Sequence, residues 1–319
     1  MGNVLFVSQN PLGRCENLTT VWDSYNGSKN FKQGQEHMEE AEHDGYSAVV
    51  CDALPKRIRD KKHCFSINIC HAITGNKYYG LDEEGPWVDP IAFAQTDIAI
   101  AAGHGAIPIV ARQLGIPEDH VVVTGLPRTD RIFGRKKGDG KTFLSDKRSY
   151  LYIPTFRNSD LGGWIPKIDW QRIDSILSDN EVIAVKRHYF TMEPLVNGEF
   201  EHVKEIDPWD PLNGYLIDCD AVISDYSSSI FDAYLLGKPV VLTLDDKKAY
   251  LKDRKMYFDY PDFYCSRSLA VSGHEDELVD ILRNMDGLSD VEKNCIDILA
   301  NACDGHATER VISLIKSVA

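Results

Sequence analysis

The sequence of 319 residues lacks any apolar run near the roughly 20 residues that a membrane-spanning helix needs. It also lacks a basic amino-terminal stretch followed by a long apolar core, so we predict no secretion signal. The eight cysteines include no CxxC pair and no short cysteine and histidine spacing of the kind that binds zinc. We therefore expect buried thiols in a reducing, cytoplasmic compartment.

Positive charge is scarce as well. The chain has 35 Lys and Arg residues against 49 Asp and Glu residues, which gives a formal net charge of −14. Non-specific binding of nucleic acid and broad contact with anionic lipid both depend on a basic surface. We expect no nucleic-acid partner and, at most, a peripheral association with the inner face of the membrane. A few local cations can still bind a small anionic ligand.

Short apolar runs alternate with helical patterns along the chain. The expected strands are GNVLFV, YSAVVCD, FSINIC, TDIAIAA and HVVVTG in the first half, and SYLYIPT, EVIAVKRH, CDAVISD and KPVVLTLD in the second. The expected helices are Gln35–Asp44, Ile107–Leu114, Ile168–Ser178, Ser228–Leu236 and Glu275–Met285, with one or two more after Val291. Apolar strands separated by helices are typical of parallel sheets covered on both faces, and two such sets predict two Rossmann-like units.

The segment Arg131–Arg148 is polar and rich in glycine and lysine, which is typical of a joint between domains. We therefore predict a first domain at residues 1–135 and a second at residues 145–300. Residues 301–319 are predicted to form a carboxyl-terminal helix, for which a return to the first domain is one option.

The strongest chemical signal is a strand that runs into Asp225-Tyr226-Ser227-Ser228-Ser229 and then into a helix. The serines lie where the first turn of a helix leaves unpaired N–H groups. Such N–H groups, the hydroxyls and the positive helix end can hold a phosphate. Capping of the helix by Ser227 or Ser228 is the alternative, and the pattern leaves both interpretations open.

Two more strands end in polar residues. Thr155 and Arg157 follow the first, and Lys186, Arg187 and His188 follow the second. Ligands of open α/β sheets bind at the carboxyl ends of the strands. Arg157 is able to pair with a phosphate or to form a surface salt bridge, and both readings stay open. A histidine flanked by two cations favours contact with an anion.

In the first half, His71 directly follows a predicted strand. A neutral imidazole there can take a proton from a hydroxyl, and a half-buried histidine bonded to a loop is the alternative. Arg128 can reach a ligand or pair with Asp130. Gly103–Ala106 has the look of a phosphate loop, but a single GxG is weak evidence, and we expect a turn into the next helix there.

Taken together, these segments resemble the CDP-glycerol glycerophosphotransferase family, a group with the GT-B fold. The blocks that carry the resemblance are His71 with Thr74 and Lys77, Thr124–Asp130, Pro154–Arg157, Lys186–His188, Asp225–Asp232, Asp245–Asp259 and Asp304–Arg310. The resemblance implies an α/β, GT-B-like fold in which two Rossmann-like domains have parallel sheets that face a central cleft.

The resemblance also implies roles for individual residues. His71 would be the base that acts on the acceptor hydroxyl, with Thr74 and Lys77 on the acceptor side. His188 would be a second catalytic histidine, in contact with the donor phosphates. The implied donor-binding residues are Arg128, Thr155, Arg157, Lys186, Arg187, Tyr189, Asp210, Asp225, Ser227, Ser228 and Ser229. Tyr189 would lie beside the cytosine, and Asp210 near the ribose.

The implied reaction is attack of an acceptor hydroxyl on the β-phosphorus of a CDP-linked alcohol, with release of CMP. CDP-glycerol is the first expectation for this co-substrate, and no cofactor or metal is expected. The acceptor would be a saccharide, a polyol phosphate or a lipid-linked chain, and the oligomeric state stays open. Two alternatives are a nucleotide-sugar glycosyltransferase of the same fold, which would release UDP or GDP, and a nucleotide-binding module without turnover.

Overall fold

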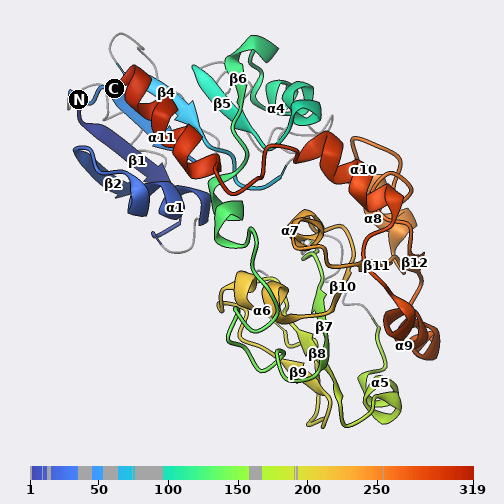
Figure 1. Cartoon of the computed structure of the whole chain (residues 1–319). Coiled ribbons are helices and arrows are strands. Elements are labelled where there is room, and N and C mark those ends of the chain that lie inside the picture. The colour runs from blue at the N-terminus through green and yellow to red at the C-terminus, as the bar shows by residue number, and fades with distance from the viewer. Residues whose placement is uncertain are drawn as a thin grey trace. The chain divides into compact units, whose positions relative to one another are not determined.

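The computed structural model divides the chain into two compact units (Figure 1). Unit 1 comprises Met1–Phe133, Arg254–Tyr257 and Ile296–Ala319, and unit 2 comprises Gly134–Asp253 and Phe258–Cys295. The structure describes residues 2–8, 10–12, 16–34, 45–52, 64–73, 75, 96–157, 167–189, 191, 193–253 and 255–319. The predicted helix Gln35–Asp44 lies outside these residues.

Unit 1 contains a six-stranded sheet with the order β2-β1-β3-β4-β5-β6, in which all pairs are parallel. Its strands are β1 (Val4–Ser8), β2 (Lys29–Gln33), β3 (Ala48–Cys51), β4 (Phe65–Asn68), β5 (Ile98–Ala101) and β6 (Val121–Val123). Every residue of β1 is buried, as expected for a strand covered on both faces. The five strands predicted here are confirmed, and β2 was missed because its sequence, KNFKQ, is polar and none of its residues is fully buried.

Within its described residues, unit 1 has the helices α1 (Glu16–Ser24), η2 (His104–Ala106), α4 (Ile107–Leu114), η3 (Glu118–His120), η4 (Pro127–Arg131) and α11 (Ala307–Val318). The prediction for α4 is confirmed, and the helix ends at Gly115, which has the left-handed φ of 62° that favours glycine. The turn expected at Gly103–Ala106 is also confirmed, as η2. A Cβ on Gly105 would come within 2.4 Å of the Ile298 side chain, so this glycine allows close packing.

The segment Gly125–Asp130 holds α11 in place. The Asp130 carboxylate accepts the N–H groups of Ala307 over 3.1 Å and Thr308 over 2.7 Å, in the first turn of that helix. Gly125 has a φ of 76°, and a Cβ there would lie 2.2 Å from the carbonyl oxygen of Ala302. Asp130 therefore serves as an acceptor for α11.

Unit 2 contains a second six-stranded parallel sheet, with the order β12-β11-β10-β7-β8-β9. Its strands are β7 (Arg148–Ile153), β8 (Glu181–Val185), β9 (Val203–Glu205), β10 (Ala221–Ser224), β11 (Val240–Thr243) and β12 (Ser268–Leu269). The four predicted strands are the four central ones. The two edge strands, β9 and β12, are too short to leave a pattern in the sequence.

The helices that the structure describes as beginning in unit 2 are α5 (Trp170–Ile176), α6 (Leu212–Asp218), α7 (Ser229–Leu235), α8 (Lys247–Asp253), α9 (Glu275–Asn284) and α10 (Asp290–Leu299). The predicted helices at 168–178, 228–236 and 275–285 are confirmed as α5, α7 and α9 with slightly shorter ends. The Asp218 carboxylate accepts the N–H groups of Gly138, Gly140 and Thr142. The glycine-rich segment is therefore fixed against the end of α6.

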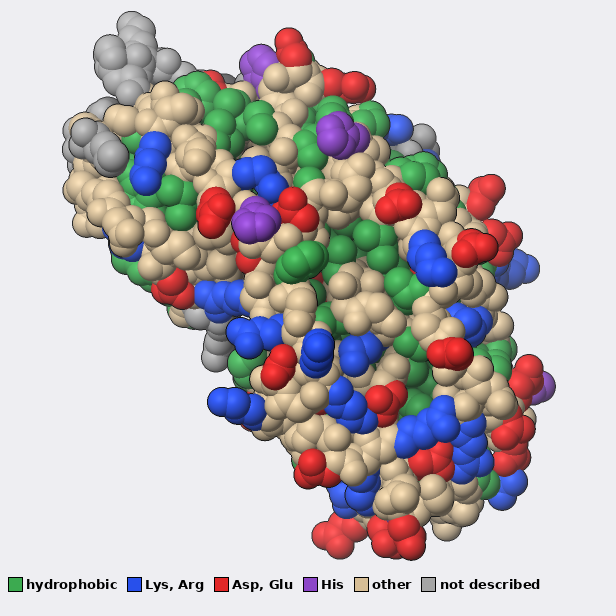
Figure 2. Space-filling view, in the orientation of Figure 1, with side chains coloured by type: hydrophobic (Ala, Val, Ile, Leu, Met, Phe, Trp, Pro, Cys, Tyr) green, Lys and Arg blue, Asp and Glu red, His purple; other side chains and the backbone are tan. Residues whose placement is uncertain are grey.

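Among the helices that the structure describes, none combines the length and the apolarity that a membrane span requires. Lys and Arg side chains alternate with Asp and Glu side chains over the face of unit 2 that Figure 2 shows. This visible face is therefore not a continuous basic surface.

Candidate functional site

Three neighbouring strands of unit 2, β10, β7 and β8, end at the same edge of the sheet because they are parallel. This edge brings together Thr155–Arg157, Lys186–Tyr189 and Asp225–Ser229, as the sequence predicts. The N–H of Thr155 donates to Oδ1 of Asp225 over 2.7 Å, which ties the ends of β7 and β10 together. The candidate donor residues of unit 2 thus share one edge.

Arg157 lies in a buried ion-pair network. Its Nη1 is 2.9 Å from Oδ2 of Asp225, and its Nε donates to Oδ2 of Asp246 over 2.7 Å. The guanidinium also lies over the rings of Tyr226 and Tyr250, at 5.1 Å and 4.9 Å. Burial disfavours the charged guanidinium, but the two carboxylates outweigh burial and hold the pKa of Arg157 above its usual value. Of the two readings for Arg157, the structure displays the ion pair, in the interior rather than at the surface.

The serine turn after β10 is half-buried. Ser227 Oγ accepts the N–H of Ser229 over 3.2 Å, so Ser227 satisfies one donor at the start of α7. Ser228 is the N-cap residue but makes no side-chain cap bond. Within the described residues, the hydroxyls of Ser228 and Ser229 take part in no hydrogen bond. These two hydroxyls are therefore available to a ligand.

The cations after β8 contact the neighbouring loop. Lys186 Nζ donates to the carbonyls of Asp207 and Pro208 over 3.1 Å and 2.8 Å. Arg187 pairs with Glu205 at 3.2 Å. Lys186 thus helps to fix the segment that follows β9, and Arg187 contacts the last residue of β9 itself.

His188 belongs to a row of four rings, in which the Phe156–His188 pair is tilted and the two following pairs are stacked. Its ring lies 4.6 Å from Phe156 and 4.4 Å from Tyr189, and Tyr189 in turn stacks on Trp209 at 5.1 Å. Trp209 is 53% exposed. Sequence reasoning missed Trp209, although a tryptophan in the polar segment Asp207-Pro208-Trp209-Asp210 is an unusual enough residue to have signalled a surface for stacking.

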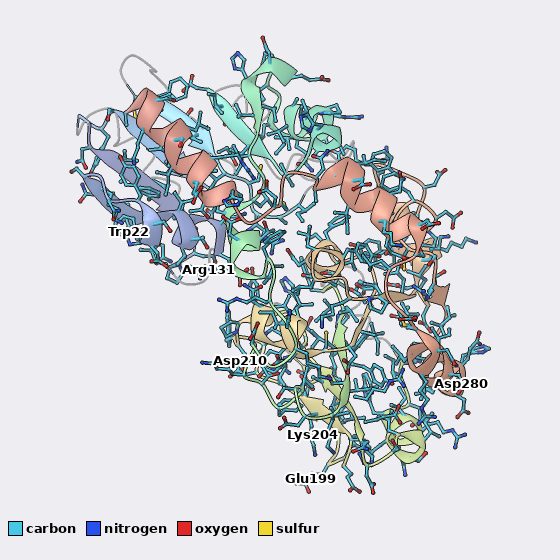
Figure 3. All side chains as sticks on the ribbon, in the orientation of Figure 1. Trp22, Arg131, Glu199, Lys204, Asp210 and Asp280 are labelled. Carbon is cyan, nitrogen blue, oxygen red and sulfur yellow. The ribbon has the colours of Figure 1, made fainter. Side chains whose placement is uncertain are left out.

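Asp210 lies between β9 and α6, on unit 2 (Figure 3). Its Oδ2 accepts the hydroxyl of Tyr215 over 2.9 Å. It is thus next to Trp209 in the chain, at the end of the ring row.

In unit 1, His71 is the third residue after β4. The residue before it, Cys70, has a φ of 54°, and its N–H donates to Oδ1 of Asn68 over 2.9 Å. Desolvation of the charged ring, followed by the positive charge of Arg128, lowers the pKa of His71 to about 4. The side chain also has an exposed face, so a neutral imidazole is accessible there. Thr74 and Lys77 lie outside the described residues.

Asn17 connects the His71 loop to the turn that carries Arg128. Its Nδ2 donates to the carbonyl of Cys70 over 3.0 Å, and its Oδ1 accepts the N–H of Arg128 over 2.9 Å. The Arg128 guanidinium lies 3.8 Å from Glu16. Sequence reasoning missed Asn17, because nothing in its local sequence points to residues so far along the chain.

Asp52 was missed too, although it follows the apolar run of β3 directly. It is 6% exposed, and Oγ of Ser8 donates to it over 3.2 Å. Burial raises the pKa of Asp52 to about 6, against the lowering effect of the Ser8 hydrogen bond. A carboxylate at the carboxyl end of β3, next to β4 and its His71 loop, is a further candidate for proton chemistry.

The sequence of the chain matches the family described as CDP-Glycerol:Poly(glycerophosphate) glycerophosphotransferase over residues 26–317. The chain belongs to this family. The resemblance that the motifs gave is therefore confirmed.

Two curated relatives illustrate how the chain compares with other members of the glycerophosphotransferase family. It is 28% identical to the teichoic acid ribitol-phosphate polymerase TarL of Staphylococcus aureus, over 77% of this chain and 46% of TarL. It is 26% identical to the teichoic acid poly(ribitol-phosphate) polymerase of Bacillus spizizenii, over 98% of this chain and 54% of that protein. The chain spans about half the length of these relatives.

The structure of the wall teichoic acid polymerase TagF is similar to this one, with a TM-score of 0.80 and 18% identity over 99% of this chain and 88% of that chain. This likeness concerns the fold. Together with the two parallel six-stranded sheets, it confirms the predicted α/β, GT-B-like fold class of this family member.

Proposed function

We propose that this family member transfers a polyol phosphate from a CDP-linked donor to an acceptor hydroxyl and releases CMP. The observation that carries the proposal is the convergence of Ser227–Ser229, Thr155 and the His188 ring row at one edge of the unit 2 sheet. Membership of the family supports the same reaction class. Glycerol phosphate is the first candidate for the group transferred, and ribitol phosphate is the second, because the relatives include ribitol-phosphate polymerases.

In this proposal, unit 2 binds the donor. The hydroxyls of Ser228 and Ser229 would bond to the phosphate oxygens, with His188 beside them. Arg157 would act indirectly, because it holds Asp225, which in turn accepts the N–H groups of Thr155 and Tyr226. The arginine thus stabilises the shape of the loop that presents the serines.

The base role falls to His71. A lowered pKa keeps its imidazole neutral at physiological pH, so one ring nitrogen is able to accept a proton. The acceptor O–H would lose its proton to that nitrogen as the new O–P bond forms and the P–O bond to CMP breaks. Fixed donors and cations around the phosphates would stabilise the charge that develops on the phosphate oxygens.

The scheme uses no metal. Asp245 and Asp246 are adjacent carboxylates near this edge, but both are engaged. Asp245 accepts the N–H groups of Val271 and Ser272, and Asp246 bonds to Arg157 and to the hydroxyl of Tyr226. This engagement argues against a catalytic metal held by the pair.

We also propose that the protein works in the cytoplasm. Cysteines in the core of both units are buried thiols, which suits a reducing compartment. They are Cys51, Cys70, Cys219, Cys265, Cys295 and Cys303.

The test is to incubate the purified chain with CDP-glycerol, CDP-ribitol and common nucleotide sugars, with polyol-phosphate and saccharide acceptors, and to identify the released nucleotide. Release of CMP supports the proposal. Release of UDP or GDP would support a glycosyltransferase, and binding without turnover a nucleotide-binding module. The double variant Ser228→Ala/Ser229→Ala should lose donor binding, whereas Ser313→Ala, an exposed serine in α11, should retain it.

A further inference from the structure

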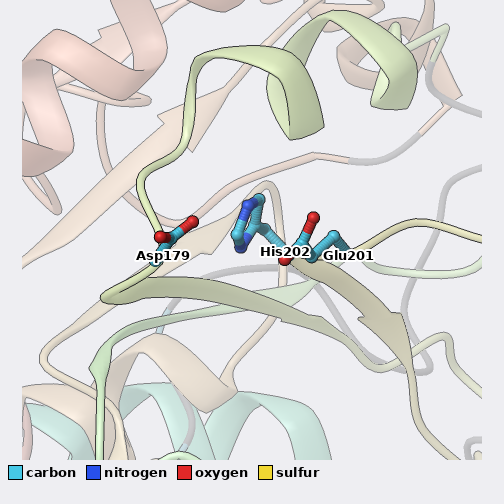
Figure 4. A group of neighbouring side chains, drawn as sticks. All are labelled: Asp179, Glu201 and His202. Carbon is cyan, nitrogen blue, oxygen red and sulfur yellow. The ribbon is translucent and has the colours of Figure 1, made fainter.

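Three potential metal ligands gather at the edge of the unit 2 sheet opposite the proposed donor site. Asp179 precedes β8, and Glu201 and His202 precede β9. Because β8 and β9 are parallel, their amino ends meet at the same edge. Figure 4 shows the His202 ring between the two carboxylates.

The ligand atoms of the three side chains lie within 4.8 Å of one another. His202 is only 6% exposed, and its Nδ1 is buried without a hydrogen-bond partner among the residues that the structure describes. Buried polar atoms in proteins are nearly always satisfied, so an unpartnered nitrogen on a buried ring that lies between two carboxylates indicates a ligand.

The surroundings are negative. The carboxylate of Asp174, in α5, accepts the N–H groups of Glu201 and His202 over 3.3 Å and 2.7 Å. In the described part of the chain, no Lys or Arg forms an ion pair with Asp179 or Glu201. A cation at this position would therefore neutralise charge that the protein leaves uncompensated.

We propose that Asp179, Glu201 and His202 bind a divalent transition metal, with Zn²⁺ as the best match. An imidazole and two carboxylates are ligands that Zn²⁺ accepts, whereas Mg²⁺ prefers oxygen ligands alone. Ligand atoms of a tetrahedral zinc site are about 3.3 Å apart, given zinc–ligand bonds of about 2.0 Å. Asp179 and Glu201 are exposed, so their side chains can rotate to close the site around the buried histidine.

The metal would cross-link two chain segments at the edge of the sheet. β9 is an edge strand of three residues, and the site connects its start to the turn before β8. Binding should therefore stabilise unit 2 and leave the specificity for the nucleotide unchanged, because the strands present the donor residues at their other ends.

The experiment is a titration of the chelator-treated full chain with ZnCl₂, followed by calorimetry and by the midpoint of thermal unfolding. We expect one equivalent to bind and the midpoint to rise by about 5 °C at a hundredfold excess over the dissociation constant. The variants Asp179→Asn/Glu201→Gln and His202→Gln should each weaken binding at least about tenfold. MgCl₂ should have no effect at the same concentration.

The double variant His274→Ala/His306→Ala serves as the matched control. It removes two exposed histidines that lie 3.4 Å and 3.5 Å from glutamates in the first turns of the helices that they precede, and it should bind Zn²⁺ like the wild type. Asp179 and Glu201 are exposed, so their double variant should fold normally even if His202→Gln does not. Equal affinity in the wild type and the carboxylate variant, or no binding by the wild type, would overturn the proposal. Binding of CDP-glycerol to the metal-free chain is measured separately, so that a failure of the metal site can be told apart from a failure of the proposed donor site.

Discussion

The side-chain oxygen of Asn17 accepts the backbone N–H of Arg128 over 2.9 Å, inside unit 1. The other end of the same amide donates to the carbonyl of Cys70, the residue before His71. Asn17 is 2% exposed, so both bonds are shielded from water. The buried side chain of Asn17 thus fixes both the loop that carries His71, the proposed base, and the turn that carries Arg128, whose charge helps to lower the pKa of His71.

Replacement of Asn17 by alanine should therefore affect both stability and turnover. The loss of these bonds leaves buried backbone groups unsatisfied, which should lower the free energy of unfolding of unit 1 by about 1–3 kcal/mol. The kcat should fall about tenfold or more, with donor KM nearly constant, because a misplaced base transfers protons poorly. Asn284→Ala, which removes an exposed amide that donates to its own helix, should change neither quantity. Wild-type turnover by Asn17→Ala would contradict the positioning role.

The pH dependence of transfer should report on His71 and Arg128. Since the pKa of His71 is about 4, the acid limb of kcat/KM should lie well below pH 6.5. Arg128→Met removes a like charge that disfavours the protonated ring, so the limb should move to higher pH. Arg131→Met is the control, because Arg131 lies in the same turn but pairs with the exposed Asp23 at 2.9 Å. An acid limb that stays in place in Arg128→Met would show that another group is the base.

Asp52→Asn should stabilise unit 1 at neutral pH. The pKa of Asp52 is about 6 in the folded chain and near 3.8 when unfolded, so between these values the folded state binds more protons. The contribution of Asp52 to stability is therefore present below about pH 3.8 and is lost as pH rises through 6. Asparagine has no charge to bury, so the free energy of unfolding should rise by about 1–3 kcal/mol at pH 7. Urea unfolding measures this change.

Asp119→Asn provides the comparison for Asp52→Asn, because Asp119 is exposed and should have little effect on stability. If Asp52→Asn were less stable than the wild type at pH 7, the hydrogen bond from Ser8 would outweigh the penalty of burying the carboxylate. A gain in stability with a loss of transfer would support a role for Asp52 in the chemistry.

The sequence predicted the central strands of both sheets because residues buried on both faces are apolar throughout, as in β1. It could not predict β2, β9 and β12, which lie at sheet edges and are polar or very short. The shared edge of the candidate site was predictable because the strands were expected to be parallel and polar residues follow their carboxyl ends.

The partners of the candidate residues were not predictable. Asp246 is 89 residues from Arg157, and Asn17 is 53 residues from Cys70. Local patterns give the type of a residue and the end of a strand on which it lies. They do not show which carboxylate of a distant loop pairs with a buried cation, because the two residues are brought together only when the strands assemble into the sheet.

Arg157 should be needed for the stability of unit 2. Arg157→Ala leaves the carboxylates of Asp225 and Asp246 without their countercharge in the interior, which should cost about 3–5 kcal/mol. Arg172→Ala removes an exposed pair with Asp276 and should cost less than about 1 kcal/mol. The urea midpoints of the two variants give the comparison. Wild-type stability of Arg157→Ala, together with loss of CDP-glycerol binding, would instead place the arginine on the donor phosphates.

The last prediction concerns the carboxyl-terminal helix α11. Asp130 accepts two N–H groups of its first turn, Ala307 and Thr308, where a carboxylate is also favoured by the helix dipole. Asp130→Ala should therefore lower the free energy of unfolding of unit 1 by about 1–2 kcal/mol and speed hydrogen exchange along α11. Asp290→Ala is the matched control, since Asp290 lies in the first turn of α10 but only pairs with Lys293 at the surface, at 3.7 Å. Equal exchange in the two variants would show that the Asp130 bonds are not needed, and that the buried residues Val311 and Ile315 and the bond from Arg310 to the carbonyl of Thr124 keep α11 docked.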